Sequence, residues 1–133
     1  MNLFVDTSAL YAVLDRNDRR HTDARATWRE LLETGSRLFT TNYVQVELAA
    51  LAQTRIGMDA VGTLSSDLLP VITTIWVDES IHRSAAHAHL ASSRRSLSLV
   101  DCVSFEAMRR FNLREVFCFD PHFSQQGFAV VPG

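Results

Sequence analysis

Short apolar segments alternate along this chain with longer segments of helical periodicity, and this alternation restricts the fold more than any other feature. Strands that alternate with helices usually form a parallel sheet, because parallel neighbours are joined by helical crossovers. We therefore predict an α/β fold with a parallel sheet covered by helices on both faces. The predicted strands are 3–5, 37–40, 71–77, 115–119 and 128–131. The predicted helices are 7–14, 22–34, 43–55, 59–69, 80–92 and 99–111.

Two of these strands have a predicted place in the sheet. Residues 71–77 are rich in β-branched side chains and are expected to form a central strand, whereas 128–131 is expected at an edge. The two tryptophans, Trp28 and Trp76, are expected in the core together with the phenylalanines.

Length and composition limit the chain further. Its 133 residues, 47% of them hydrophobic, fit one domain with one sizeable core. No apolar stretch reaches the roughly 18 residues of a membrane span, and an acid follows as early as Asp6, so neither a membrane segment nor a signal peptide is expected. Two cysteines form no disulfide framework, and a reducing cytoplasm is the simplest location. The net charge of −2 disfavours nonspecific coating of nucleic acid.

All thirteen basic residues are arginine, and the absence of lysine excludes several functions. A P-loop nucleotide site needs its lysine on the phosphates, and Schiff-base chemistry needs a lysine amine. A haloacid-dehalogenase-type phosphatase also starts with a strand and an aspartate, but it needs a lysine and a second aspartate where this chain has Ser8. The receiver domain of a response regulator relies on a lysine as well.

Two aspartates directly follow predicted strands. Asp6 comes after Leu3-Phe4-Val5, and Asp120 comes after the strand 115–119. Ligands of open parallel sheets bind beyond the carboxyl ends of the strands, where both acids are expected. The alternative is structural: Asp6 would cap the first helix, and Asp120 would be a turn or cap residue.

Two further acids lie on apolar helix faces. Glu47 shares a face with Tyr43, Ala50 and Leu51, and Asp101 shares one with Phe105 and other core residues. The alternative is an acid that reaches out to solvent or favours the first turn of its helix, which fits Asp101 better than Glu47.

Together, the four acids can converge at one end of the sheet. Two carboxylates about 5 Å apart repel each other by roughly 3 kcal/mol at an effective dielectric constant near 20. Four of them need a counterion, or some would take up protons. Ligands that are all oxygen select magnesium, manganese or calcium over zinc or copper.

Four segments, in order and over nearly the whole chain, resemble the motifs of the PIN-domain family, and specifically of the VapC toxins of toxin–antitoxin pairs. The segments are Phe4-Val5-Asp6-Thr7-Ser8-Ala9-Leu10, Val46-Glu47-Leu48, Ser98-Leu99-Val100-Asp101-Cys102-Val103-Ser104-Phe105, and Phe119-Asp120-Pro121-His122-Phe123 followed by Gly127-Phe128.

The resemblance implies a single PIN domain over residues 1–133, with a three-layer sandwich around a parallel sheet of about five strands. It also implies an endoribonuclease that depends on Mg²⁺ or Mn²⁺, cuts tRNA or rRNA in the cytoplasm and forms a homodimer. A cognate VapB-type antitoxin would inhibit it, and DNA would be contacted only through that antitoxin. A PIN-like domain without catalysis, which only binds RNA or protein, is the alternative.

In the mechanism that follows, Asp6 and Asp101 would be the primary metal ligands, and Glu47 and Asp120 further or water-mediated ones. The metal would activate a water and neutralise charge on the scissile phosphate, and Glu47 could orient the water or take its proton. The products would carry a 3′-hydroxyl and a 5′-phosphate.

Several other polar residues have two interpretations. Thr7 and Ser8 either cap the first helix or bind a phosphate or a metal-bound water. The arginines of two clusters either contact RNA phosphates or form a solvated face: Arg16, Arg19 and Arg20, and Arg94 and Arg95. The histidines lack the spacing of a helical zinc motif. We expect three of them, His82, His87 and His89, to be exposed on a helix, and His122 to lie in a turn.

Overall fold

The computed structural model describes all residues from Met1 to Gly133 and contains one five-stranded sheet. Every neighbouring pair of strands is parallel, in the order β3-β2-β1-β4-β5. The strands are β1 (Asn2–Val5), β2 (Arg37–Thr41), β3 (Ile72–Ile75), β4 (Glu115–Phe117) and β5 (Ala129–Val131). The predicted parallel sheet is confirmed.

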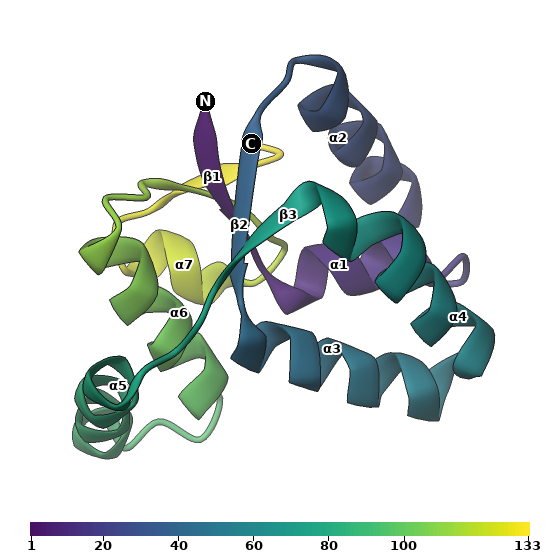
Figure 1. Cartoon of the computed structure of the whole chain (residues 1–133). Helices are drawn as coiled ribbons and strands as arrows, with labels where there is room; N and C mark the ends of the chain where they lie inside the picture. Colours follow the sequence, from purple (N-terminus) through teal and green to yellow (C-terminus); the bar gives the residue numbers. More distant parts are fainter.

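Helices cover both faces of this sheet, as predicted (Figure 1). They are α1 (Thr7–Leu14), α2 (His21–Glu33), α3 (Asn42–Arg55), α4 (Met58–Thr63), α5 (Glu79–Ser92), α6 (Leu99–Arg110) and α7 (Pro121–Gln125). In Figure 1, α1, α2 and α4 lie to the right of the sheet, and α5, α6 and α7 lie to its left, while α3 runs below. None of the helices is long and apolar enough to cross a membrane.

The strands are buried on both faces because both are covered. Along β1, Phe4 packs into the core beneath α5, α6 and α7, whereas Leu3 and Val5 pack into the core beneath α1 and α2. Helix α3 contributes to both cores, through Val44 on one side and Leu48 on the other. This two-sided burial explains why the strands read as continuous apolar runs rather than as alternating ones.

The structure corrects the predicted place of the strand 71–77. β3 is an edge strand that ends at Ile75, so the β-branched run marks a strand without making it central. Trp76, which follows it, is 72% exposed, and the expectation that it lies in the core was wrong. The predicted helix 59–69 is also divided, since α4 is followed by a π-helical turn, η1 (Leu64–Leu68), and a 3₁₀ turn, η2 (Leu69–Val71).

Helix α7 was not predicted. β4 ends at Phe117, earlier than expected, and Asp120 caps a short helix that begins at Pro121. Asp120 accepts a hydrogen bond from the backbone N–H of His122 at 2.8 Å. Proline fits the first position of a helix, since its missing N–H would have no partner there. Asp120 and Pro121 therefore form the start of a helix rather than a turn.

The carboxyl ends of the strands point toward α3, at the bottom of Figure 1. The two ends of the chain lie at the opposite end of the sheet, where Met1 and Gly133 line one hollow. The residues that follow β1 and β4 are thus placed on the same side as the start of α3.

Candidate metal centre

Asp6 is a buried carboxylate at the start of α1. Its side chain is 3% exposed, and it accepts hydrogen bonds from the backbone N–H of Ser8 at 3.2 Å and from Ser8 Oγ at 2.8 Å. Its own backbone N–H donates to the carbonyl of Phe117 at 3.0 Å, which joins the end of β1 to the end of β4. The capping interpretation of Asp6 is therefore correct, and it places the carboxylate at the strand ends.

Burial makes the charge on Asp6 costly. The pKa of Asp6 is raised to about 7, mainly by desolvation and in smaller part by the charges of Asp101 and Asp120, while the hydrogen bonds from Ser8 oppose the rise. Such a carboxylate is stabilised in its charged form by a nearby cation. The acids are close enough for electrostatic coupling, as expected from the sequence.

Ser8 connects two parts of the centre. Its hydroxyl donates to Asp6 and accepts the backbone N–H of Phe119 at 3.0 Å. Ser8 therefore holds Asp6 against the segment that leads to Asp120. The hydroxyl of Thr7 is buried and has no hydrogen-bond partner in the protein.

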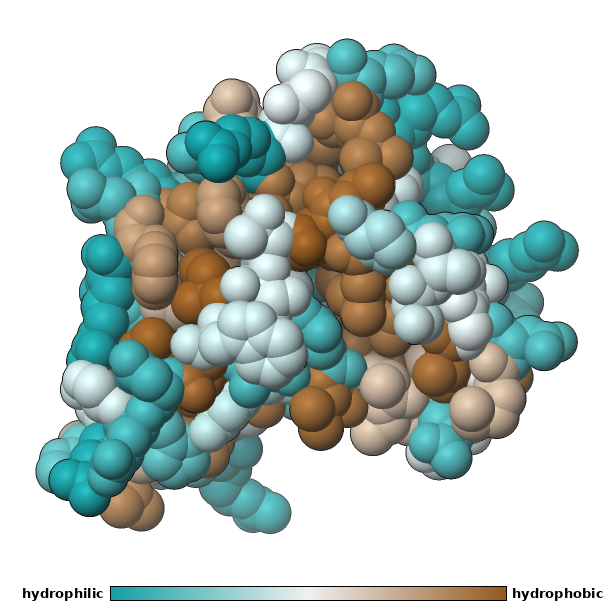
Figure 2. Space-filling model, in the orientation of Figure 1, coloured by the Kyte–Doolittle hydropathy of each residue, from teal (hydrophilic) through white to brown (hydrophobic).

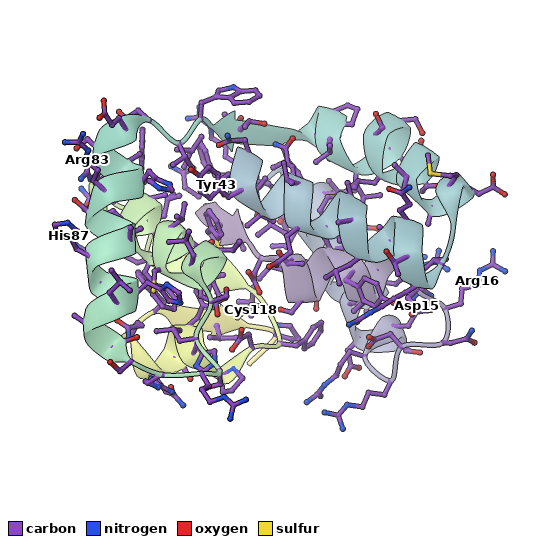
Figure 3. All side chains as sticks on the ribbon, turned by 90° about the horizontal axis from the view of Figure 1, so that it is seen from below. Asp15, Arg16, Tyr43, Arg83, His87 and Cys118 are labelled. Atoms are coloured by element: carbon purple, nitrogen blue, oxygen red, sulfur yellow. The ribbon has the colours of Figure 1, made fainter.

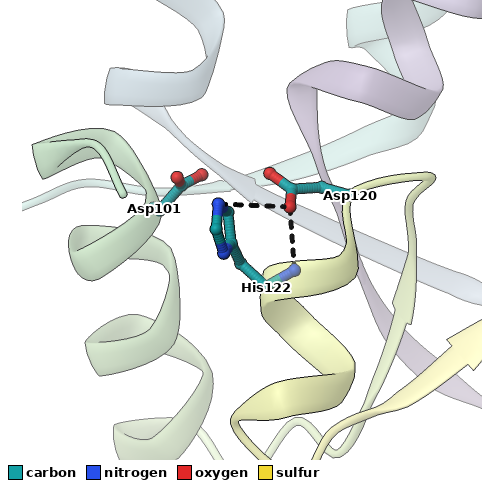
Figure 4. Close-up of side chains that lie close together, drawn as sticks. All are labelled: Asp101, Asp120 and His122. Atoms are coloured by element: carbon teal, nitrogen blue, oxygen red, sulfur yellow. Dashed lines mark hydrogen bonds and ion pairs between the residues drawn. The ribbon is translucent and has the colours of Figure 1, made fainter. Parts of the chain in front are cut away.

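Asp101 belongs to the capping box of α6. Its carboxylate accepts the backbone N–H of Ser98 at 3.1 Å, and the hydroxyl of Ser98 accepts the backbone N–H of Asp101 at 3.0 Å. Partial burial raises the pKa of Asp101, and the charge of Asp120 adds to this rise. The capping box orients the carboxylate toward Asp120 (Figure 4).

Asp120 and His122 complete a three-residue group with Asp101 (Figure 4). One ligand atom from each residue lies within 4.8 Å of the others, a spacing that suits ligands of one ion. The imidazole Nε2 of His122 lies 3.9 Å from Asp120 Oδ1 and 3.0 Å from the carbonyl of Ser96. His122 was expected in a turn, but it lies in the first turn of α7 with only 12% of its side chain exposed.

Glu47 stands slightly apart from this group. It is half-buried on α3 and lines the same pocket of about 380 Å³ as Asp6, Asp101 and Asp120. It is not among the three residues whose ligand atoms lie together. The structure thus gathers Asp101 and Asp120 closely, couples Asp6 to both, and places Glu47 on the pocket wall formed by α3.

The pocket is also lined by Tyr11, Arg55 and Phe119, for which the sequence suggested no role at the site. Arg19 and Arg20, which the sequence offered as phosphate contacts or as part of a solvated face, line the same pocket. Arg55 lies eight residues after Glu47 on α3, so helical periodicity could have placed it on the same face. His122 could have been found from the Asp-Pro helix start.

Cys118 lies near the middle of this end of the sheet, which Figure 3 shows from below. Burial raises the pKa of its thiol to about 12, and Cys118 is not among the three residues whose ligand atoms lie together. The centre is therefore one of oxygen donors with a single imidazole.

Three of the other four histidines lie on α5, and His21 is the first residue of α2. His87 is exposed as expected (Figure 3). His82, however, shares a hydrogen bond of 2.6 Å with the hydroxyl of Tyr43, and His89 Nε2 lies 3.0 Å from the carbonyl of Leu97. The expectation of three exposed histidines was wrong for these two, which tie α5 to its neighbours.

The chain matches the family model described as the PIN domain over residues 3–129. The chain belongs to the PIN domain family. The family resemblance noted in the sequence is thereby confirmed, and with it the three-layer PIN fold.

Within the PIN family, the chain is similar to a "23S rRNA-specific endonuclease VapC20" of Mycobacterium tuberculosis, with 30% identity over 130 residues and 97% of each chain covered. The crystal structure of M. tuberculosis VapC20, described as a sarcin-ricin loop cleaving toxin, has a TM-score of 0.85 and 28% identity, and the match covers 96% of both chains. VapBC2 from Rickettsia felis, at 13% identity, 98% and 97% coverage and a TM-score of 0.69, shares the PIN fold. So does FitAcB from Neisseria gonorrhoeae, at 16% identity, 98% and 96% coverage and a TM-score of 0.69.

Proposed function

We propose that this PIN protein is a metal-dependent endoribonuclease and the toxin of a VapBC-type toxin–antitoxin pair. The observation that carries the proposal is the buried carboxylate of Asp6, electrostatically coupled to Asp101 and Asp120 at the carboxyl ends of the strands. The similarity to VapC20 along almost the whole chain supports the same function.

The donor set fits a hard divalent cation, and we assign it to Mg²⁺ or Mn²⁺. Asp6 and Asp101 would be the primary ligands, with Asp120 and Glu47 as further or water-mediated ones, and His122 faces the same position. When bound, such an ion lowers the pKa of a water and stabilises charge on a phosphate.

The protein's own residues would then orient the reaction. No hydrogen bond within the protein engages the carboxylate of Glu47, which leaves it available to orient the attacking water or accept its proton. Ser8 and Ser98 hold Asp6 and Asp101 in place. In-line attack would leave a 3′-hydroxyl and a 5′-phosphate.

The test is RNA cleavage by the purified protein. Wild-type protein is expected to cut RNA only with Mg²⁺ or Mn²⁺, and Asp6→Asn and Asp101→Asn are expected to lower the rate at least about a hundredfold. Asparagine keeps the helix caps, so circular dichroism should show folded variants. Asp59→Asn, on the exposed start of α4, is the matched control. RNA binding without metal-dependent cutting would favour the non-catalytic PIN-like module instead.

We further propose ribosomal RNA as the substrate, rather than tRNA, because VapC20 carries that specificity in its name. A synthetic hairpin of the sarcin-ricin loop and total tRNA should be compared as substrates. Sequencing of the cleaved ends would identify the site. A cytoplasmic location follows from this substrate and agrees with two unpaired cysteines.

The proposed partners are a cognate VapB-type antitoxin and a second copy of the chain. A chain in each of the VapBC2 and FitAcB structures has the same fold as this chain. DNA would be reached only through the antitoxin. We assign the homodimer to the surface around the β3 edge, where Val46 and Trp76 are 70% and 72% exposed. Figure 2 shows hydrophobic side chains, in brown, on both sides of a strip of near-neutral ones, in white, that runs down the middle of this face.

A further inference from the structure

Two arginines lie against aromatic rings in the lining of the acidic pocket. The guanidinium carbon of Arg20 is 5.4 Å from the centroid of the Phe119 ring, and that of Arg55 is 5.6 Å from the centroid of the Tyr11 ring. All four residues line the pocket that holds Asp6 and the other acids. The face of an aromatic ring attracts a guanidinium group and restricts its position.

Neither arginine is neutralised by a carboxylate. Only two arginines of the chain form ion pairs within 4.0 Å, Arg83 with Glu79 and Arg110 with Glu106. Arg20 and Arg55 have no such partner, although five acidic side chains line their pocket. An aromatic ring, unlike a carboxylate, does not neutralise the charge of a guanidinium, which can still attract an anion.

The local structure holds both pairs in place. The hydroxyl of Tyr11 donates to Asp15 Oδ2 at 2.8 Å, which fixes the ring beneath Arg55 at the end of α3. The backbone N–H of Arg20 donates to Asp18 Oδ1 at 2.8 Å, so the loop before α2 is ordered without using the arginine side chain. Phe119 is held through its own N–H by Ser8.

The two pairs come from different segments around the acids. Phe119 directly precedes Asp120, whereas Arg55 extends from the helix that carries Glu47. A second hollow of about 580 Å³ shares Arg20, Phe119 and Asp120 with the acidic pocket, so open space continues past the first pair. An extended strand that crosses the acids would therefore meet positive charge at both pairs.

We propose that Arg20, on Phe119, and Arg55, on Tyr11, bind the RNA phosphates next to the scissile one. This inference rests on the proposed ribonuclease function. Arginine binds phosphate oxygens through two parallel N–H donors, and such contacts position a nucleic acid without reading its sequence. The acids would then hold the reacting phosphate between two anchored neighbours.

The test measures how RNA binding depends on salt. Wild-type protein and the variants Arg20→Gln and Arg55→Gln are titrated with a fluorescein-labelled uridine 12-mer in EDTA, at several salt concentrations. Each variant is expected to bind about tenfold more weakly at low salt, and its slope of log affinity against log salt should fall by about 0.7, the value for one phosphate contact on a single strand. Arg114→Gln is the matched control, because Arg114 is exposed just before β4, at the other end of the sheet.

A second pair of variants separates the aromatic ring from the charge. Phe119→Leu and Tyr11→Leu keep both arginines but remove the rings beneath them. We expect a smaller loss, about two- to fivefold in affinity, with the salt slope unchanged, because the charge remains but is less well placed.

The results distinguish this inference from the nuclease proposal. Salt slopes equal to that of the wild type in both arginine variants, or no binding by the wild-type protein, would overturn the phosphate contacts. In Mg²⁺ with an RNA that the wild type cuts, we expect KM to rise about tenfold while kcat stays within about twofold. If the salt slopes of the arginine variants fall as predicted but the wild-type protein cuts no RNA, the phosphate contacts are supported and the nuclease proposal is rejected.

Discussion

At the scale of single residues, Asp6 combines two roles that conflict. Its backbone and carboxylate cap α1 and join β1 to β4, which requires it to be buried. The same burial raises its pKa to about 7, which makes the charged form costly until a cation compensates it. We therefore expect the stability of the metal-free protein to depend on pH in the direction opposite to that of a salt-bridged acid.

This expectation can be measured. Folded Asp6 keeps its proton from the reference pKa of 3.8 up to about 7, where the unfolded chain has lost it, so the free energy of unfolding should fall as pH rises across that window. The full effect is on the order of 4 kcal/mol. The raised pKa of Asp101 acts in the same direction.

Urea unfolding in EDTA at pH 5 and pH 8 would show this fall, and Asp6→Asn should flatten it, whereas Asp59→Asn should not. Mg²⁺ should stabilise the protein more at pH 8 than at pH 5, because the ion competes with the proton on Asp6. A wild-type protein that is equally stable at both pH values in EDTA would show that Asp6 is ionised without a cation.

At the scale of secondary-structure elements, the start of α6 both folds the helix and aims a proposed ligand. Ser98→Ala removes the hydroxyl that accepts the N–H of Asp101, and caps of this kind contribute about 1 kcal/mol. We expect that loss in urea unfolding, together with a fall in RNA cleavage of about fivefold or more, because Asp101 loses its orientation. Ser65→Ala, in an exposed position of η1, should change neither. A folded Ser98→Ala protein that cuts RNA at the wild-type rate would show that the capping box does not position Asp101.

Some of these elements could be predicted from the sequence and others could not. The strand that precedes Asp6 and the helix that carries Glu47 could be predicted from their apolar residues, which pack in the two cores on either side of the sheet. The edge position of β3 could not be predicted, because a run of β-branched residues packs well in any strand whose faces are partly covered. Helix α7 was not predicted, because five residues are too few to show a helical repeat of apolar side chains, although the Asp-Pro sequence at its start is typical of a helix beginning.

At the scale of the whole molecule, the convergence of the acids was predictable, whereas the side-chain packing around the site was not. Acids that follow parallel strands must meet at one end of the sheet, and this end holds Asp6 and Asp120 as expected. The contacts of Arg20 and Arg55 depend on side-chain directions from separate segments, which no spacing reveals. The exposure of Trp76 likewise depends on which strand forms the edge.

The proposed dimer gives a prediction at this scale. Trp76→Arg places a charge in the exposed apolar surface beside β3 and is expected to convert a dimer into a monomer, because a buried unpaired charge is strongly unfavourable. Sedimentation equilibrium would measure the mass of both proteins. Leu90→Arg, a comparably exposed apolar position on α5, is the control. A monomeric wild type, or a dimer that survives Trp76→Arg, would contradict the assigned surface.

Three helices begin where the proposed metal ligands lie. Asp6 and Asp120 are the caps of α1 and α7, and Asp101 lies in the first turn of α6. The amino end of a helix carries a partial positive charge from its aligned peptide dipoles. We expect these dipole ends to offset part of the repulsion among the carboxylates in the metal-free protein and, in the proposed reaction, to attract the negative charge of the RNA phosphate. The backbone itself would thus supply an electrostatic contribution that remains when the carboxylates are replaced by amides.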